Sequence, residues 1–122
     1  MTFHRFLVLS LICLLLTSCI RRGGNPEHFY FGPYSEAEKF YSKGEYEKAI
    51  EKYQAYIDEN PDGNLAVISQ YYIAKSHASL GHMDQAKTLY EEIIQKYPDL
   101  VWAKFAETQL KELDSNPVSP AS

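Results

Sequence analysis

The sequence predicts an all-α fold, in which two antiparallel helix hairpins and one C-terminal capping helix stack into a short right-handed solenoid. Three observations predict it: a set of residues recurs at one separation, apolar residues within each unit follow helical spacing, and a proline ends each unit. The chain has 122 residues, 45% hydrophobic and 23% charged, which is the composition of an ordinary globular protein with one domain at most.

Residues 1–18 are expected to form a signal peptide. Arg5 precedes a mostly apolar run from Phe6 to Leu16, which is shorter than the roughly 20 residues of a membrane-spanning helix but fits a secretory h-region. The residues from Leu16 to Cys19 resemble the bacterial lipobox. That resemblance implies cleavage after Ser18 and acylation of Cys19, so that lipid anchors the mature chain in a membrane. The alternative is an ordinary signal peptide that leaves Cys19 as an incidental thiol.

Residues 19–33 are expected to be a flexible tether, because Gly23, Gly24 and Pro26 are linker residues. Residue 20 is Ile and not Asp. By analogy with lipoprotein sorting in Gram-negative bacteria, this favours the outer membrane, with the protein facing the periplasm. The inner membrane and the cell surface stay open as alternatives.

The folded domain is expected over residues 34–113, with repeats over about 34–61 and 65–98. Four pairs of residues define the repeat, each 37 residues apart: Gly44 and Gly81, Ala49 and Ala86, Tyr53 and Tyr90, Pro61 and Pro98. Each glycine is expected to end the first helix of its unit in a left-handed conformation, and each proline to stop the second. The alanines are expected where the paired helices cross most closely.

The first helix of the first unit is expected to begin with a capping box. Ser35 and Glu38 have the required spacing, in which the hydroxyl of Ser35 accepts the amide of Glu38 and the Glu38 carboxylate reaches back. The second unit is expected to run from Leu65 to Leu80, turn at Gly81, and resume from Met83 to Tyr97. A fifth helix is expected over residues 99–113 as a capping helix, and residues 114–122 as a disordered tail.

The pattern of a turn glycine, an alanine, an aromatic residue and a final proline resembles the tetratricopeptide repeat. The match is good for the second helix of each unit and poorer for the first. The longer period looks like the periplasmic Gram-negative subgroup, whose members include an outer-membrane barrel-assembly lipoprotein, a pilotin and a cell-division coordinator.

In the family that the chain resembles, the first helices line a groove that binds partner peptides. Transferring the groove positions onto this sequence gives Tyr34, Glu38, Tyr41, Tyr71, Lys75, Ala78 and Phe105. Aromatic residues there are expected to anchor a peptide. The alternative is that about half of them simply pack between repeats. For Tyr46, Tyr53 and Tyr90, core packing with the hydroxyl reaching the rim is expected.

No catalytic motif, cofactor site or metal site is expected. The sequence holds no Gly-rich phosphate loop, nucleophile elbow or HExxH motif, and no spacing completes a zinc site around His77 and His82. We therefore expect these two histidines to be structural and the protein not to be an enzyme. The net charge of −4 and the absence of a Lys/Arg-rich run argue against nucleic-acid binding.

Two functional hypotheses follow. In the first, the protein is a membrane-anchored scaffold or assembly factor that docks a segment of another envelope protein. In the second, it is a structural subunit that self-associates, such as a pilotin-like or barrel-assembly-like accessory protein. Repeat arrays usually need about three units for stability, so a partner or a homo-oligomer that completes the stack is expected under either hypothesis.

Overall fold

The computed structural model describes residues 31–116, in which the chain forms five α-helices and no strand. These helices are α2 (Pro33–Ser42), α3 (Tyr46–Glu59), α4 (Ala66–Ser79), α5 (Met83–Lys96) and α6 (Val101–Ser115). The expected all-α fold of two hairpins and one further helix is confirmed. The expected signal peptide, Cys19 and most of the tether lie outside the described residues.

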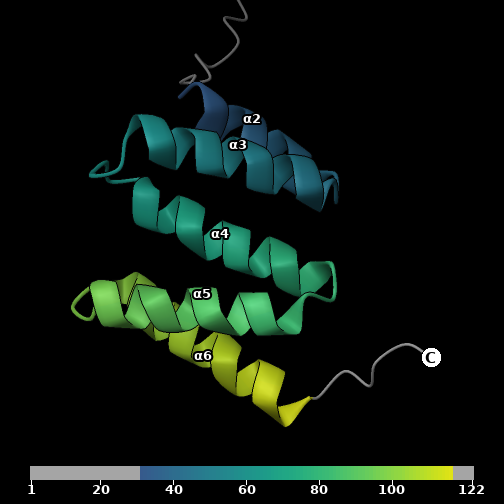
Figure 1. The fold of residues 1–122 in the computed structure, drawn as a ribbon, viewed down its shortest axis with the longest axis vertical. Helices are drawn as coiled ribbons and strands as arrows, with labels where there is room; N and C mark the ends of the chain where they lie inside the picture. The colour runs from purple at the N-terminus through teal and green to yellow at the C-terminus, as the bar shows by residue number, and fades with distance from the viewer. Residues whose placement is uncertain (1–30, 117–122) are drawn as a thin grey trace, which may run out of the picture.

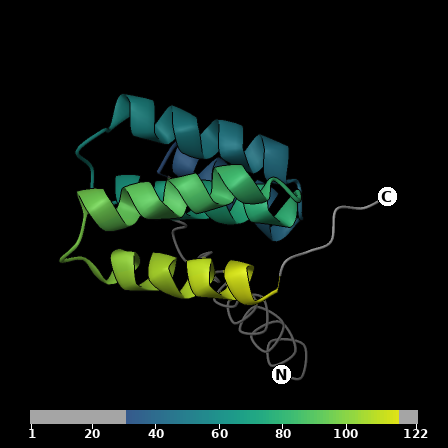
Figure 2. The same ribbon diagram turned by 60° about the horizontal axis from the view of Figure 1, so that its bottom comes forward.

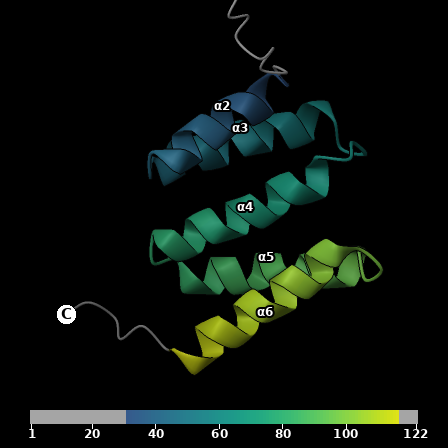
Figure 3. The same cartoon turned by 180° about the vertical axis from the view of Figure 1, so that it is seen from behind.

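Each helix packs against the next one along the chain, so the molecule is a stack with α2 at one end and α6 at the other (Figure 1). The second helices α3 and α5 lie in front in Figure 1, whereas α2 and α6 lie in front when the molecule is seen from behind (Figure 3). A further contact joins α4 to α6 directly. Helices α2 and α6 therefore lie on the same side of the stack, opposite α3 and α5.

The turn from α2 to α3 is a Schellman motif around Gly44. The Gly44 N–H donates to the Tyr41 carbonyl at 3.0 Å, and the Glu45 N–H donates to the Phe40 carbonyl at 3.0 Å. Gly44 has φ 75° and Gly81 in the second turn has φ 81°, both in the left-handed region. The predicted role of the two glycines is confirmed.

The predicted capping box at the start of α2 is wrong. The helix begins at Pro33, with Gly32 as the N-cap at φ 55°, so Ser35 lies inside the first turn. Its hydroxyl accepts the backbone N–H of Phe31 at 2.9 Å instead of the amide of Glu38. The physical reason is Pro33, whose fixed φ and missing N–H suit the first helical position and start the helix earlier.

The second helices end as predicted. Helix α3 ends at Glu59 and α5 at Lys96, each two residues before the proline of its unit. The residue before a proline is disfavoured in the helical region, and the proline itself lacks the N–H that the next helical bond requires. Pro61 and Pro98 therefore fix where the chain turns towards the following helix.

The helices cross at alanines, which allow close approach. Ala49 and Ala86, the predicted crossing residues, are fully buried, and so are Ala37, Ala74 and Ala106. Two core clusters result, one around Tyr53 between α2, α3 and α4, the other around Tyr90 between α4, α5 and α6. Ile68, Tyr72 and Leu89 pack against both clusters and join them into one core.

Both repeat tyrosines are buried, as predicted, but the Tyr90 hydroxyl does not reach the rim. Tyr53 is 1% exposed and Tyr90 is fully buried. The Tyr90 hydroxyl has no hydrogen-bond partner among residues 31–116. Burial is the main cause that raises the pKa of Tyr90 well above its ordinary range, and the nearby Tyr71 raises it further.

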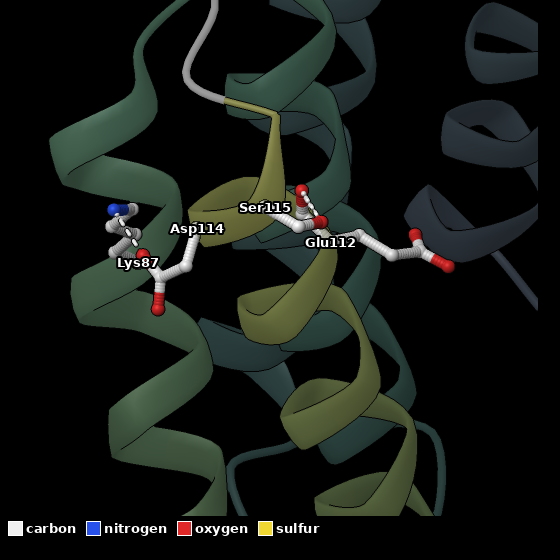
Figure 4. Close-up of polar contacts among 4 residues, drawn as sticks. All are labelled: Lys87, Glu112, Asp114 and Ser115. Atoms are coloured by element: carbon white, nitrogen blue, oxygen red, sulfur yellow. Dashed lines mark hydrogen bonds and ion pairs between the residues drawn. The ribbon is translucent and has the colours of Figure 1, made fainter.

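Helix α6 is displaced by two residues from its predicted range of 99–113. Asp99 and Leu100 form the turn before it, and the helix continues through Asp114 and Ser115, which the sequence analysis placed in a disordered tail. Figure 2 shows α6 running beside α5. The Lys87 ammonium of α5 forms an exposed ion pair with the Asp114 carboxylate at 2.6 Å (Figure 4), which links the last turn of α6 to α5.

The last turn of α6 also contains a hydrogen bond between two of its own residues. The Ser115 hydroxyl donates to the Glu112 carbonyl at 3.1 Å, while the Glu112 carboxylate points away from Lys87 (Figure 4). Residues 117–122 of the predicted tail lie outside the described residues. Within residues 31–116, no helix has the length and apolar character that crossing a membrane requires.

Candidate functional site

Aromatic rings contact one another through the whole stack. Tyr34 of α2 meets Tyr53 of α3 edge-on at a centroid distance of 5.7 Å, and Tyr53 stacks on Tyr72 of α4 at 5.7 Å. Tyr72 also contacts Tyr41 at 5.0 Å and Tyr71 at 5.7 Å. Each such pair contributes about 0.5–1.5 kcal/mol beyond its buried area, so the rings stiffen the interface between the two hairpins.

The rings reach the surface at a cluster of three residues that we call the α4/α6 aromatic cluster: Tyr71, Trp102 and Phe105. Tyr71 lies 5.3 Å from Trp102 and 6.3 Å from Phe105, and these two are 5.4 Å apart. The Lys75 ammonium lies 5.9 Å from the centre of the Tyr71 ring. Tyr71 is nearly buried, Trp102 is half-buried, and Phe105 is 45% exposed. The cluster thus has a buried side, formed by Tyr71, and an exposed apolar side, formed by Phe105.

A hollow of about 430 Å³ lies beside the cluster, between the α3–α4 loop and the α5–α6 loop. Trp102 lines it together with Val67 and Tyr97, and Lys96 adds a positive charge. The other lining residues are Pro61, Asp62, Gly63, Asn64, Leu100 and Val101. Its volume is in the range of pockets that accept small molecules or single large side chains.

The apolar character of this region continues onto the surface of α6. Leu100 is 43% exposed and Val101 is 54% exposed, next to Trp102 in the chain. The large exposed hydrophobic residues within 31–116 are these two, Phe105 and Phe31. Two of the four, Leu100 and Val101, line the hollow, and Phe105 contacts Trp102, which also lines it. Such a grouping is typical of a protein interaction surface.

The tyrosines of the region keep their protons at neutral pH. Burial is the main cause that raises the pKa of both Tyr71 and Tyr41. A neighbouring tyrosine raises each pKa further: Tyr72 acts on Tyr71, and Tyr46 acts on Tyr41. A protonated phenol keeps a donor at the edge of an apolar ring. The site can therefore offer apolar area, hydroxyl donors and ammonium groups to a ligand.

The structure brings four of the seven predicted groove residues into one region. Tyr71 contacts Phe105 within the α4/α6 aromatic cluster, Lys75 lies over the Tyr71 ring, and Tyr41 joins them through Tyr72.

The other three predicted groove residues lie elsewhere or are covered. Tyr34 is 8% exposed and packs against Tyr53 and Tyr56. Ala78 is half-buried against the second core cluster. The structure places Tyr34 and Ala78 in packing roles and leaves the carboxylate of Glu38 exposed at the α2 end.

The sequence analysis missed Trp102, Leu100 and Val101. Two signals were present: Trp102 is the single tryptophan of the chain, and three consecutive apolar residues interrupt the amphipathic pattern where a terminal helix begins. The transferred groove positions include one residue of α6, Phe105, and not these three.

Within the described residues, no group of three or more His, Cys, Asp or Glu side chains is arranged to hold a metal ion.

The sequence profile described as Tetratricopeptide repeat matches residues 34–63 and residues 69–100, just over half of the chain. The first match covers α2 and α3, and the second covers most of α4 and all of α5. Among curated proteins, none matches the chain. Proteins built from such repeats are generally non-enzymatic scaffolds that bind protein partners. With two matched hairpins, each with a glycine at its turn and a proline after its second helix, the chain belongs to the tetratricopeptide repeat family.

Proposed function

We propose that this protein is a lipoprotein of the bacterial envelope whose repeat domain docks a segment of another envelope protein on the α4/α6 aromatic cluster. The observation that carries the binding site is the exposed apolar edge of Phe105 and Val101 beside a hollow that Trp102 lines. Hot spots of protein interfaces are enriched in such aromatic anchors, which cluster where water is excluded.

The chemistry of the site specifies the kind of segment that fits it. The hollow accepts one large apolar side chain and is lined by Lys96, and Lys75 adds a second positive group over the Tyr71 ring of the adjacent cluster. A partner segment with an aromatic or aliphatic anchor and a nearby carboxylate satisfies both features. Scaffold and assembly-factor roles follow from holding such a segment at a membrane.

Selected peptides test the docking site. We expect peptides chosen from a random library against the full chain to bind at least about tenfold more weakly when Phe105→Ser removes the exposed ring. Phe31→Ser is the matched control, because Phe31 is 50% exposed, has the same side chain and precedes α2 at the other end of the stack. Equal losses in the two variants, or a loss only at Phe31, would place binding elsewhere and contradict the proposal.

The membrane anchor rests on the sequence alone, on the h-region and the residues from Leu16 to Cys19. We expect the wild-type chain to incorporate labelled palmitate and to sediment with membranes when it is produced in a Gram-negative host. Cys19→Ser should abolish the label and release the chain from the membrane fraction. A Cys19→Ser variant that stays membrane-bound would mean that lipid on this cysteine is not the anchor.

Self-association is the second candidate function, and one observation favours it. A capping helix should present a polar outer face, yet α6 leaves Leu100, Val101 and Phe105 exposed on the last helix of the stack. Pairing of two copies through α6 would cover these side chains. Analytical ultracentrifugation of the chain in detergent separates the two candidates: a monomer favours docking of another protein, and a dimer that Val101→Lys dissociates favours self-association.

A further inference from the structure

Three of the four large hydrophobic residues that are exposed within residues 31–116 lie at one end of the helices. Because each helix runs antiparallel to the next, α2, α4 and α6 begin at the same end, and α3 and α5 finish there (Figures 1 and 3). We call it the loop end and define it by residues 31–33, 60–65 and 96–101. Phe31 is 50% exposed there, Leu100 43% and Val101 54%.

Contacts between side chains join the parts of the loop end. The Tyr34 ring in the first turn of α2 meets the Tyr56 ring in the last turn of α3 at a centroid distance of 5.6 Å. A Cβ atom on Gly63 would lie 3.1 Å from the Tyr56 hydroxyl, which places that hydroxyl against the α3–α4 loop. The hollow of about 430 Å³ lies between this loop and the α5–α6 loop, which carries Leu100. The loop end is therefore one continuous surface.

The opposite end of the helices has a different composition. The α2–α3 turn there holds Lys43, Gly44 and Glu45, and the α4–α5 turn holds Gly81 and His82. Within residues 31–116, none of the large exposed hydrophobic residues lies at that end. Hydrophobic residues scattered singly over a surface need no explanation, but a group of them at one end marks an interaction surface.

The position of the expected lipid anchor indicates what covers the loop end. The described chain begins at the loop end with Phe31, and Cys19 precedes Phe31 by 12 residues. Fully extended, these residues span at most about 40 Å. Acyl chains on Cys19 would therefore keep the loop end near a bilayer. Tethering of this kind raises the effective concentration of a surface at its target, so a contact that is weak by itself becomes occupied.

The side chains of the loop end suit the interface of a bilayer. Leu100 and Val101 supply exposed aliphatic groups. Tyr97 and Trp102 lie beside them along the hollow, and tyrosine and tryptophan are the residues enriched at the level of lipid headgroups. The same surface thus combines apolar groups with aromatic rings that carry a polar atom.

The charge of the loop end identifies apolar contact as the driving force. Asp62 and Asp99 are exposed there, against one exposed lysine, Lys96. Anionic headgroups attract polybasic segments, and this surface is the reverse of one. A zwitterionic lipid surface is therefore the favoured partner.

We propose that the loop end is a membrane-contact surface, which lies on the headgroup region of a zwitterionic bilayer through Phe31, Leu100 and Val101. The proposal rests on the proposed function for the lipid anchor at Cys19. The acyl chains hold the protein on the membrane, and the loop end determines which way the domain faces. The α4–α5 turn then points away from the bilayer. Phe105, one turn further along α6, stays available to a partner that reaches the membrane surface.

Quenching of a dye by spin-labelled lipid tests the orientation, with the lipidated chain reconstituted in phosphatidylcholine vesicles. An environment-sensitive dye is attached through Asn64→Cys at the loop end or, as the matched control, through Ser79→Cys at the opposite end of α4. Both positions are exposed. We expect quenching at position 64 to be at least about threefold stronger, because the 14 residues of α4 keep position 79 about 21 Å further from the lipid.

Two pairs of substitutions test which side chains make the contact. Leu100→Glu with Val101→Glu puts charges where apolar groups meet the bilayer, and should lower quenching at position 64 to the level of position 79. Gln85→Glu with Thr88→Glu adds the same charges to exposed positions near the start of α5, and should leave quenching unchanged. Circular dichroism checks that the helices persist in both variants.

Equal quenching at the two positions, or quenching that survives Leu100→Glu with Val101→Glu, overturns the proposal. A blue shift of the dye at position 64 without quenching by lipid also overturns it, and assigns the loop end to a second copy of the chain. A chain that does not float with the vesicles contradicts the anchor at Cys19, and the membrane contact falls with it. A chain that floats but shows no difference between the two positions contradicts the membrane contact alone.

Discussion

Tyr90 buries a hydroxyl that has no hydrogen-bond partner among residues 31–116, in the middle of the second core cluster. An unpaired buried hydroxyl costs about 1–3 kcal/mol of stability. Tyr90→Phe removes that cost and keeps the ring, so we expect the free energy of unfolding to stay the same or to rise by up to about 1 kcal/mol. Tyr90→Ala should lower it by about 3–5 kcal/mol, because it leaves a cavity.

Urea denaturation of the three chains measures these differences. A loss of more than about 1 kcal/mol in Tyr90→Phe would show that the hydroxyl has a partner, such as a buried water, and would contradict the prediction.

Gly81 offers a second prediction at the same scale, because its φ of 81° lies in the left-handed region while the space around it is open. Any loss of stability on substitution of Gly81 therefore comes from strain in the backbone and not from a steric clash of the new side chain. We expect Gly81→Ala to lower the free energy of unfolding by about 1–2 kcal/mol, and Gly81→Asn to lower it less, because asparagine tolerates this conformation better. Equal losses in thermal denaturation would argue against a conformational origin.

The roles of some individual residues could be predicted from the sequence, and those of others could not. Gly44, Gly81, Pro61 and Pro98 were predictable, because each has a backbone property that few other residues share. Ser35 was not, since Pro33 competes with it for the start of α2. Burial of Tyr34 was not predictable either, because it depends on contacts with α3 that the local pattern does not contain.

Helix α6 carries the prediction at the scale of an element. Ala106 is fully buried in the core cluster that also contains Ala86 of α5. We expect Ala106→Leu to overpack this crossing and to lower the free energy of unfolding by about 1–3 kcal/mol. Thr108→Leu is the matched control, because Thr108 is exposed on the same helix and should change stability by less than about 0.5 kcal/mol.

Chemical denaturation of both variants distinguishes a helix that packs closely on α5 from one that is loosely attached. If Ala106→Leu unfolds at the same denaturant concentration as the wild type, α6 does not cross α5 at this alanine.

The elements differed in how far the sequence predicted them. Helices α3 and α5 were placed well, because glycine and proline bound them on either side. Helix α6 ends at Ser115, two residues before Pro117 in the sequence, which is the spacing at which α3 and α5 end before their prolines. The signal for this end was therefore in the sequence, and the predicted end was two residues short because Pro117 was assigned to the tail and not used as the helix stop.

The whole molecule is expected to respond to alkaline pH as one unit. Burial is the main cause that raises the pKa of five tyrosines above the ordinary value of 10.0: Tyr34, Tyr41, Tyr53, Tyr71 and Tyr90. Their folded-state pKa values exceed those of the unfolded chain. The stability they contribute is therefore fully present below about pH 10 and is lost as the pH rises above it.

Ultraviolet absorbance of tyrosinate and far-ultraviolet circular dichroism check this expectation in one titration. The four buried tyrosines of this set (Tyr34, Tyr53, Tyr71 and Tyr90) should ionise only as the helices are lost, because Ile68, Tyr72 and Leu89 join the two core clusters. Complete tyrosine ionisation with the helices intact would be inconsistent with the buried rings.

The function of the whole molecule depends on whether the α4/α6 aromatic cluster holds a partner. Trp102 is the single tryptophan of the chain and lines the hollow in contact with Tyr71 and Phe105. Its fluorescence therefore reports on this site alone. When a peptide selected against the full chain is titrated in, we expect the emission of Trp102 to shift to shorter wavelength and to saturate with the binding curve. Saturated binding that leaves the Trp102 spectrum unchanged would contradict the account.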